Sequence, residues 1–208
     1  MKKKIDILGR IDILVNNAGI SIRGEIEEIN ADEVKKVFDV NVFEIINMIQ
    51  EVIPEMRKRQ YGKIINICSI SGKFTQALNG GYCASKHAVE AINDALRLEL
   101  NQYNVQSTVM EPGAMNTNFF YTLSKTSDKY MTDSHSVYKN LNESDIKYRK
   151  RQKRMDSKEA ATRICEIIMK NKLKPRYTVA VSLIFSIALK FLPDSIIEFL
   201  SLRHSRNM

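Results

Sequence analysis

The sequence predicts an α/β fold with a parallel, doubly wound sheet, on two observations. Short runs rich in β-branched residues alternate with longer runs whose apolar residues recur at helical spacing, as in strand–helix–strand units. The clearest strand run, Gly62 to Ser69, is apolar along most of its length, as strands buried on both faces of a parallel sheet are. The 208 residues suffice for one domain with a core, so we expect a single domain over residues 1–208.

The first half of the chain is expected to supply two strands and one long helix. Ile11 to Val15 is rich in β-branched residues and ends in Asn-Asn-Ala-Gly at 16–19, where glycine and asparagine favour a turn. Asn30 followed by Glu33 is the residue pair of a capping box, which predicts that a helix begins there. Apolar residues then recur at helical spacing as far as Pro54, where we expect the helix to end.

The second half alternates in the same way. We expect a helix from Tyr82 to Leu100, a strand from Val105 to Met110, a helix from Ala160 to Lys170 capped by Asp156, and a strand from Pro175 to Val181. Residues 118–154 are polar and rich in Lys, Ser and Tyr, so an irregular segment is expected there. Residues 183–208 place apolar side chains at helical spacing among basic ones, which predicts an amphipathic tail.

Tyr82 and Lys86 are the residues around which a chemical site is predicted. Four positions apart at the start of a helix, they lie on one face. An ammonium near a phenol favours the phenolate and lowers the phenol pKa, which suits a proton donor and acceptor. The spacing alone is weak evidence, because Tyr121 and Lys125 repeat it and a solvated helix face is the ordinary explanation. Tyr82 differs in following the strand that ends at Ser69, since ligands of open α/β sheets bind at the carboxyl ends of strands.

In five ordered motifs the chain resembles the short-chain dehydrogenase/reductase family. They are Asn16-Asn17-Ala18-Gly19, Asn41, Ser69 within Cys68-Ser69-Ile70-Ser71-Gly72, Tyr82 to Lys86, and Pro112-Gly113 with Thr117. The resemblance covers nearly the whole chain, and Glu44 departs from the small residue that the family usually has there. It implies a Rossmann-like fold and an NAD(P)-dependent oxidoreductase that moves a hydride between the cofactor and a carbonyl or alcohol.

The resemblance also implies a role for each residue of the site. Tyr82 would be the general acid in reduction and the general base in oxidation, and with Ser69 it would bind the substrate oxygen. Lys86 would lower the pKa of Tyr82 and hold the nicotinamide ribose, while Asn41 would organise a chain of water. Cofactor contacts are expected from Asn17, Ala18, Gly19, Tyr82, Lys86, Pro112, Gly113, Met115 and Thr117. NADP is favoured slightly over NAD, and residues 118–154 correspond to the family's variable substrate lid.

A dinucleotide site in this fold needs a Gly-rich turn after the first strand, and none of the eight glycines forms one. In the family the Asn-Asn-Ala-Gly turn closes the fourth strand, so the resemblance places three strands before Met1. We therefore expect an incomplete, truncated sheet and weak cofactor binding by this chain alone. The alternative is a catalytically impaired interaction protein that keeps the helices with which the family forms dimers. The intact Ser69, Tyr82 and Lys86 argue against that alternative.

The composition limits which cellular compartment and which kinds of partner are expected. Hydrophobic residues make up 44% and charged residues 27%, as in ordinary soluble domains. The net charge of +8 is spread along the chain, and the basic run Lys147 to Arg154 fits a solvated helix end, so nucleic acid is not expected as a partner. Three cysteines without framework spacing predict reduced thiols and a cytoplasmic location, and three histidines show no metal-ligand spacing.

The expected partners are a small carbonyl or alcohol substrate of hydrophobic character and further copies of the chain in a homo-oligomer. For the tail at 183–208, packing over the substrate pocket or on a partner subunit is favoured over peripheral membrane contact. Its apolar run is too short to span a bilayer, which needs about 20 residues.

Overall fold

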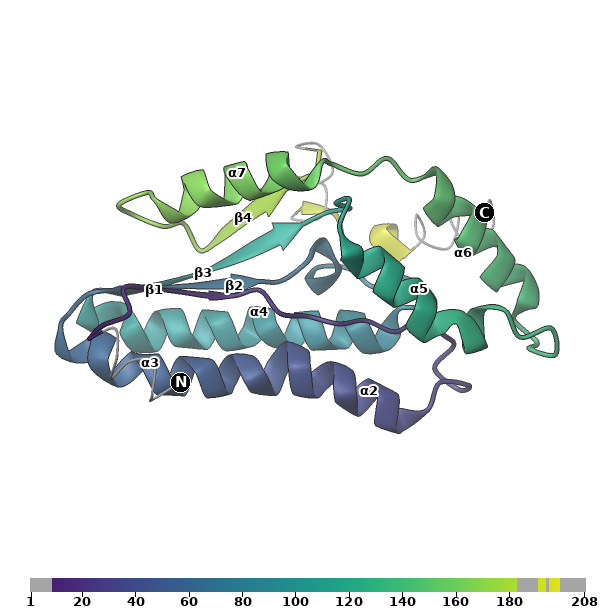
Figure 1. The fold of residues 1–208 in the computed structure, drawn as a ribbon, viewed down its shortest axis with the longest axis horizontal. Helices are drawn as coiled ribbons and strands as arrows, with labels where there is room; N and C mark the ends of the chain where they lie inside the picture. Colours follow the sequence, from purple (N-terminus) through teal and green to yellow (C-terminus); the bar gives the residue numbers. More distant parts are fainter. Residues whose placement is uncertain (1–8, 183–190, 194, 199–208) are drawn as a thin grey trace.

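The computed structural model describes residues 9–182, 191–193 and 195–198. In this part of the chain, four parallel strands form one sheet in the order β1-β2-β3-β4 (Figure 1). The strands are β1 (Ile13–Asn16), β2 (Gly62–Ile67), β3 (Val105–Pro112) and β4 (Arg176–Val179). All four lie where the sequence predicts strands, so the α/β class with a parallel sheet is confirmed.

Helices cover both faces of this sheet (Figure 1). One face carries α2 (Ala31–Phe38), α3 (Glu44–Lys58) and α4 (Gly80–Leu100), and the other carries α7 (Ser157–Ile168). The short helical turns are η1 (Asp39–Phe43), η2 (Ile70–Gly72) and η3 (Asn101–Tyr103). This placement makes the sheet doubly wound, and it directs the carboxyl ends of all strands to one rim.

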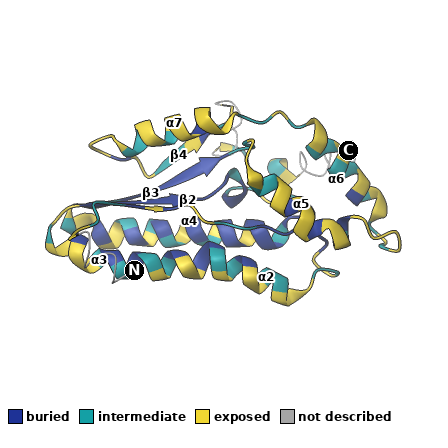
Figure 2. Ribbon diagram, viewed as in Figure 1, coloured by how far each residue is buried: buried dark blue, intermediate teal, exposed yellow. Residues whose placement is uncertain are grey.

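The hydrophobic core has two parts, because successive side chains of a strand point to opposite faces. Ile64 of β2 joins Val52 of α3 and Val89 of α4 in the larger part. Ile65, the next residue, joins Met110 of β3 against α7 in the smaller part. Figure 2 shows the buried residues concentrated in β2 and β3 and on the inward faces of α3 and α4.

Strand β1 lies at one edge of the sheet within the described residues, and it pairs with β2 from Ile13↔Lys63 to Asn16↔Asn66. Its side chains differ sharply between the two faces. Leu14 is 5% exposed beneath α3, whereas Val15, on the α7 side of the sheet, is 43% exposed. An edge position for β1 within the described residues agrees with the incomplete sheet expected from the sequence.

The long helix expected from Asn30 to Pro54 differs from the prediction in three respects. A π-helical turn, η1, separates α2 from α3, and Pro54 lies inside α3 instead of ending it. Pro54 cannot donate a backbone hydrogen bond, but the packing of Val52 and Met56 against the core keeps the helix intact at this point. Asn30 caps α2 by accepting from the backbone of Asp32, but Glu33 bonds the hydroxyl of Tyr130 instead of closing a capping box.

The segment 118–154, expected to be irregular, is largely helical. It forms α5 (Asn118–Met131) and α6 (Lys139–Arg151) beyond the carboxyl ends of the strands (Figure 1). The basic run is not simply solvated either, because Arg149 pairs with the buried Asp145 and Arg154 lies 4.0 Å over the ring of Phe120. In the following, the lid means α5, α6 and the connection between them, residues 118–151 of the longer segment 118–154.

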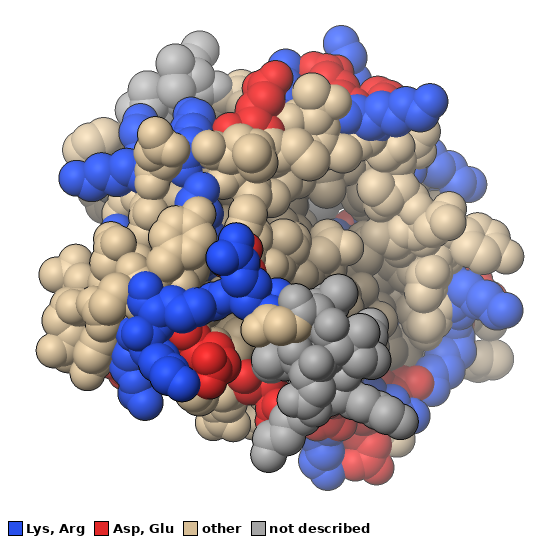
Figure 3. Space-filling model, turned by 60° about the vertical axis from the view of Figure 1, so that its left-hand side comes forward, with Lys and Arg blue, Asp and Glu red and all other residues tan. Residues whose placement is uncertain are grey.

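Most of the predicted amphipathic tail, at 183–190, 194 and 199–208, lies outside the described residues. None of the described helices combines the length and the apolar character that crossing a bilayer requires. Over the face seen in Figure 3, basic side chains are interleaved with acidic ones, in keeping with the spread of charge along the sequence.

Candidate active site

The carboxyl end of β2 and the first turn of α4 bring Ser69 and Tyr82 together. Ser69 follows β2 and caps η2 by accepting a hydrogen bond from the backbone of Ser71 at 3.1 Å. Tyr82 is the third residue of α4, and a hydrogen bond joins its side chain to that of Ser69. Each residue is 9% exposed. The strand that distinguishes Tyr82 from Tyr121 in the sequence thus leads to this contact, and Tyr121 is 74% exposed on α5.

The electrostatic prediction for Tyr82 is wrong in this structure. Burial raises the pKa of its phenol well above the ordinary value, and the hydrogen bond from Ser69 and the charge of Arg23 lower it only in part. Lys86 lies on the same helix face, as expected, with its ammonium 5.7 Å from the centre of the Tyr82 ring. That ammonium donates to the carbonyl oxygen of Ile67 at 3.0 Å. The phenol is therefore held in its protonated form near neutral pH.

Lys86 is itself 3% exposed, and burial lowers the pKa of its ammonium. The residue also fixes the neighbouring strand end, because its carbonyl oxygen accepts from the thiol of Cys68 at 3.2 Å. Burial raises the pKa of that thiol to about 12, so Cys68 is an inert buried group. Cys83, next to Tyr82, is 1% exposed and is likewise packed as a small hydrophobic residue.

Asn41 lies in the π-helical turn η1, where it is fully buried. Its amide nitrogen donates to the backbone oxygen of Ile20 at 2.9 Å and to the hydroxyl of Ser85 at 3.0 Å. Its amide oxygen accepts from the backbone nitrogen of Ile20 at 2.9 Å. Asn41 therefore fixes the loop after β1 against α4, and π turns often mark functional sites in this way.

Gly19 lies next to the side chains of Asn41 and Lys86. A side chain at this position would place its first carbon 3.4 Å from the amide oxygen of Asn41 and 3.7 Å from the ammonium of Lys86. These are ordinary van der Waals distances, and Asn41 and Lys86 are 0% and 3% exposed, so Gly19 lies against two buried polar groups. Asn17 and Ala18, the other predicted contacts in this turn, are exposed at the same rim. The turn therefore presents residues 17–19 at the rim, where the sequence motifs predict cofactor contacts.

The loop after β3 brings the remaining predicted cofactor residues to the rim. Pro112 ends β3, and the backbone nitrogen of Gly113 donates to the oxygen of Val179 at 2.8 Å. A side chain at Gly113 would meet the backbone oxygen of Ala180 at 2.4 Å, so glycine is required for this close approach. Met115 forms a bridge with Met155, and Thr117 is the residue before α5.

Sequence reasoning missed a chain of buried polar side chains behind the site. Asn16 of β1 donates to Asn66 of β2 at 2.8 Å, and Asn66 donates to Asn93 of α4 at 3.1 Å. Asn93 also accepts from the hydroxyl of Ser107 on β3 at 2.6 Å. The available signal was an asparagine within each of two otherwise apolar strand runs. This chain joins three strands to the helix that carries Tyr82 and Lys86.

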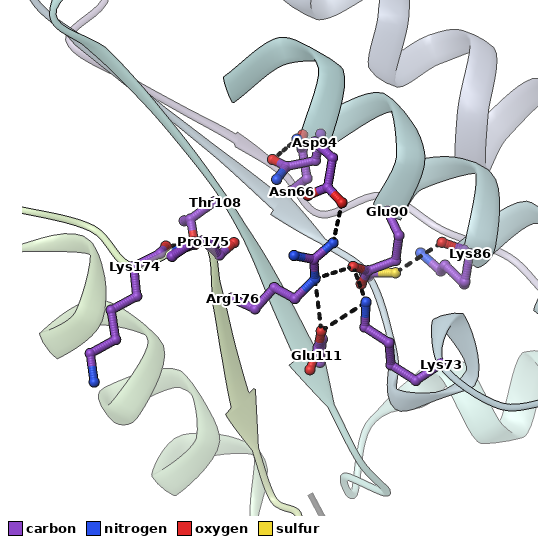
Figure 4. Close-up of polar contacts among 12 residues, drawn as sticks. Asn66, Lys73, Lys86, Glu90, Asp94, Thr108, Glu111, Lys174, Pro175 and Arg176 are labelled. Atoms are coloured by element: carbon purple, nitrogen blue, oxygen red, sulfur yellow. Dashed lines mark hydrogen bonds and ion pairs between the residues drawn. The ribbon is translucent and has the colours of Figure 1, made fainter. Parts of the chain in front are cut away.

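A second missed cluster lies one turn beyond Lys86 on α4 (Figure 4). Glu90 accepts from Lys73 at 2.7 Å and from Arg176 at 2.8 Å, and Glu111 of β3 lies 3.6 Å from both cations. Arg176 also contacts Asp94. Burial, followed by the charge of Glu90, raises the pKa of the Glu111 carboxyl. The cluster anchors the start of β4 to α4.

A doubly wound parallel sheet with a polar site at its carboxyl rim defines a Rossmann-like protein. The short chain dehydrogenase family model matches residues 1–128. Among curated proteins, the probable short-chain type dehydrogenase/reductase VdlC of Helicobacter pylori is 37% identical over 187 residues, 88% of this chain and 68% of that protein. The 3-ketodihydrosphingosine reductase of Bacteroides thetaiotaomicron is 32% identical over 195 residues, 92% of this chain and 71% of that protein.

Solved structures give the same assignment. A short-chain dehydrogenase from Streptomyces avermitilis superposes with a TM-score of 0.78 at 25% identity, over 99% of this chain and 74% of that one. A gluconate 5-dehydrogenase from Burkholderia cenocepacia, in complex with NADP and tartrate, gives 0.56 at 28% identity, over 69% and 53%. The chain belongs to the short-chain dehydrogenase/reductase family, whose members are oxidoreductases that use NAD(P).

Proposed function

We propose that this chain interconverts a carbonyl and an alcohol with NAD(P), using Tyr82 as the general acid in reduction and the general base in oxidation. The observation that carries the proposal is a buried ammonium, that of Lys86, which lies 5.7 Å from the centre of the Tyr82 ring and against Gly19 at the carboxyl rim. It lies beside a tyrosine whose hydroxyl is already engaged by Ser69. A reacting oxygen at that hydroxyl would be within reach of a proton donor and a second hydrogen bond.

Each residue has a defined task in this proposal. When bound, the nicotinamide supplies a hydride to the carbonyl carbon or removes one from the alcohol. In reduction, Tyr82 transfers its phenolic proton to the carbonyl oxygen, while Ser69 donates a hydrogen bond to the same oxygen. Lys86 would hold the ribose hydroxyls, and Asn41 would organise water near Lys86. Asn17, Ala18, Gly19, Pro112, Gly113, Met115 and Thr117 would line the nicotinamide half of the cofactor site.

A hydrophobic carbonyl is the substrate class we propose. The ring of Phe119 lies 5.8 Å from that of Tyr82, centre to centre, and Phe119 in turn packs edge-on against Phe120. One relative is named for a long-chain ketone, 3-ketodihydrosphingosine. For the cofactor, one structural neighbour holds NADP and another, a 4-hydroxyisoleucine dehydrogenase, holds NADH, so both forms belong in the assay.

We also propose a homo-oligomer formed through the outer faces of α3 and α4. Phe43, directly before α3, is 53% exposed and Leu98 of α4 is 82% exposed. Light scattering at micromolar concentration tests this arrangement. A strictly monomeric mass would contradict it without bearing on the chemistry of Tyr82.

Isotope transfer tests the proposed reaction most sharply. NADPH and NADH carrying deuterium on one face of C4 at a time are incubated with 3-ketodihydrosphingosine and with octan-2-one. We expect one deuterium on the carbinol carbon of the product, from one face of the nicotinamide only. Alcohol without deuterium from either face, or no alcohol with either cofactor, would contradict the proposal.

A further inference from the structure

Arg23 is a buried cation that the motifs do not explain. It lies in the loop between β1 and α2, and its side chain is 9% exposed. Its Nη1 donates to the carboxylate of Asp145 at 2.6 Å, and the Asp145 side chain is 7% exposed. A guanidinium is costly to bury unless it is paired, so this loop depends on Asp145 for its charge balance.

Through Asp145 and one backbone bond, Arg23 contacts both helices of the lid. Asp145 belongs to α6, where its second oxygen accepts from Nε of Arg149 at 2.7 Å. The backbone nitrogen of Arg23 donates to the hydroxyl of Ser127 on α5 at 2.8 Å. A single residue of the body of the domain thus holds α5 through its backbone and α6 through its side chain.

Other contacts between the lid and residues 21–33 include polar pairs, and the side chain of Tyr130 packs against Gly24. Ser136 donates to Glu28 at 3.0 Å, and Lys129 pairs with Glu33 at 2.9 Å. The hydroxyl of Thr126 lies 3.2 Å from the backbone oxygen of Ser21. These pairs are more exposed than Arg23 and Asp145, and exposed pairs contribute little to stability. Arg23 and Asp145 therefore form the most buried of these polar pairs, and the one whose loss should loosen the lid most.

The guanidinium of Arg23 also contacts the loop that leads into α4. Its Nη2 lies 3.5 Å from the side-chain oxygen of Gln76, in the loop that leads into α4. Its charge favours the ionised forms of Tyr82 and Cys83. The other groups around the phenol are the hydroxyl of Ser69, the thiol of Cys68 and the ammonium of Lys86. Around Arg23 itself, the charged groups are Asp145 and Arg149.

We propose that Arg23 is a positioning residue, which clamps the lid over the carboxyl rim and keeps a buried positive charge against the loop that leads into α4, the helix of Tyr82. Opening of the lid would withdraw Asp145 and leave Arg23 unpaired next to the site. The position of α6 would then be coupled to the protonation of Tyr82. The kinetic part of this inference rests on the proposed function, whereas the clamp does not.

Amide hydrogen exchange tests the clamp without any substrate. Peptides from residues 118–151 are compared in the wild type, Arg23→Gln, Asp145→Asn and Arg163→Gln, the last removing an exposed pair with Glu159 on α7. We expect exchange in α6 to become at least about tenfold faster in the first two variants and to stay unchanged in Arg163→Gln. Unchanged exchange in Arg23→Gln or Asp145→Asn would overturn the proposal, whether or not the chain is active.

The pH profile of alcohol oxidation separates positioning from a merely structural role. Arg23→Gln removes the positive charge, so the kinetic pKa of Tyr82 should rise, whereas Asp145→Asn removes the neutralising carboxylate, so it should fall. Arg23→Lys keeps the charge, so its kinetic pKa should stay near that of the wild type. This variant still tests the role of the charge if Arg23→Gln does not fold. Shifts in the same direction in Arg23→Gln and Asp145→Asn would overturn the electrostatic part. An inactive wild type would contradict the proposed function, and the exchange comparison would still decide the clamp.

Discussion

The ammonium of Lys86 donates to the carbonyl oxygen of Ile67 at 3.0 Å and lies 5.7 Å from the centre of the Tyr82 ring. Lys86 is therefore positioned by the end of β2, the same strand that delivers Ser69. In this arrangement burial governs the phenol, and the pKa of Tyr82 is raised. At neutral pH such a phenol is protonated, which is the form that carbonyl reduction needs.

The raised pKa predicts opposite pH profiles for the two directions of the reaction. Carbonyl reduction needs the protonated phenol, which the raised pKa preserves, so kcat for reduction should be flat from about pH 6 to pH 9. Alcohol oxidation needs the phenolate, so its kcat should rise with pH across that range, by about tenfold per unit at most. Initial rates in both directions in one buffer series measure this. A fall in oxidation rate with rising pH would contradict it.

The buried asparagine chain should be important for stability. Asn66→Ala leaves the donor of Asn16 and the acceptor of Asn93 without their shared partner, so we expect the free energy of unfolding to fall by about 2–4 kcal/mol. Asn47→Ala, on the exposed face of α3, should change it by less than about 0.5 kcal/mol. Urea unfolding followed by circular dichroism gives both values. Equal changes in the free energy of unfolding in the two variants would show that the buried asparagine chain does not stabilise the fold.

Gly19→Ala tests whether the cofactor binds at the turn that follows β1, next to Asn41 and Lys86. The added methyl would contact the amide oxygen of Asn41 and approach the ammonium of Lys86, without a severe clash. Stability should therefore change little, whereas cofactor affinity should weaken by at least about tenfold, near 1.4 kcal/mol. Calorimetric titration with NADH and NADPH, beside thermal unfolding of the free protein, separates the two effects. Unchanged affinity would place the cofactor elsewhere.

Glu111 should make stability depend on pH. Its pKa is raised by burial and by Glu90, so the folded protein holds this proton more tightly than the unfolded chain does. The contribution of Glu111 is therefore fully present below the unfolded pKa and is lost as pH rises through the folded pKa.

Glu111→Gln should thus gain stability relative to the wild type as pH rises from about 4 to about 8. The exposed Glu99→Gln serves as the control, since it should show no such trend. Thermal unfolding of the three proteins across this range checks the sign. A loss of relative stability by Glu111→Gln with rising pH would show that Lys73 and Arg176 outweigh burial.

The sequence predicted those parts of the fold that local patterns determine. The four strands, α4 and the meeting of Ser69 with Tyr82 follow from apolar periodicity and from the rule that strand ends share one rim. The helical lid was missed, because α5 and α6 carry polar residues on most of their surface and bury few apolar side chains, such as Leu123 and Met131. Pro54 was misread as a helix end, because packing against the core outweighs the missing hydrogen bond.

The rest of the site depends on contacts between residues far apart in the chain. Asp145 lies 122 residues beyond Arg23, and no local pattern pairs them. The raised pKa of Tyr82 likewise follows from burial in the folded chain, whereas its helix spacing to Lys86 suggests the opposite direction. Asn41 shows in the sequence as a polar residue on an apolar stripe, but its bonds to Ile20 and Ser85 follow only from the fold.

The central claim is that Tyr82 transfers the proton, and replacement of its hydroxyl tests it most directly. Tyr82→Phe keeps the packing against Phe119 but removes the phenol, so we expect kcat for carbonyl reduction to fall by at least about a hundredfold, near 2.7 kcal/mol. Cofactor affinity and unfolding temperature should remain close to wild type. Tyr121→Phe is the matched control, because Tyr121 also precedes a lysine by four positions yet is 74% exposed, and its kcat should be unchanged. A Tyr82→Phe variant that kept more than about a tenth of the wild-type rate would contradict the account.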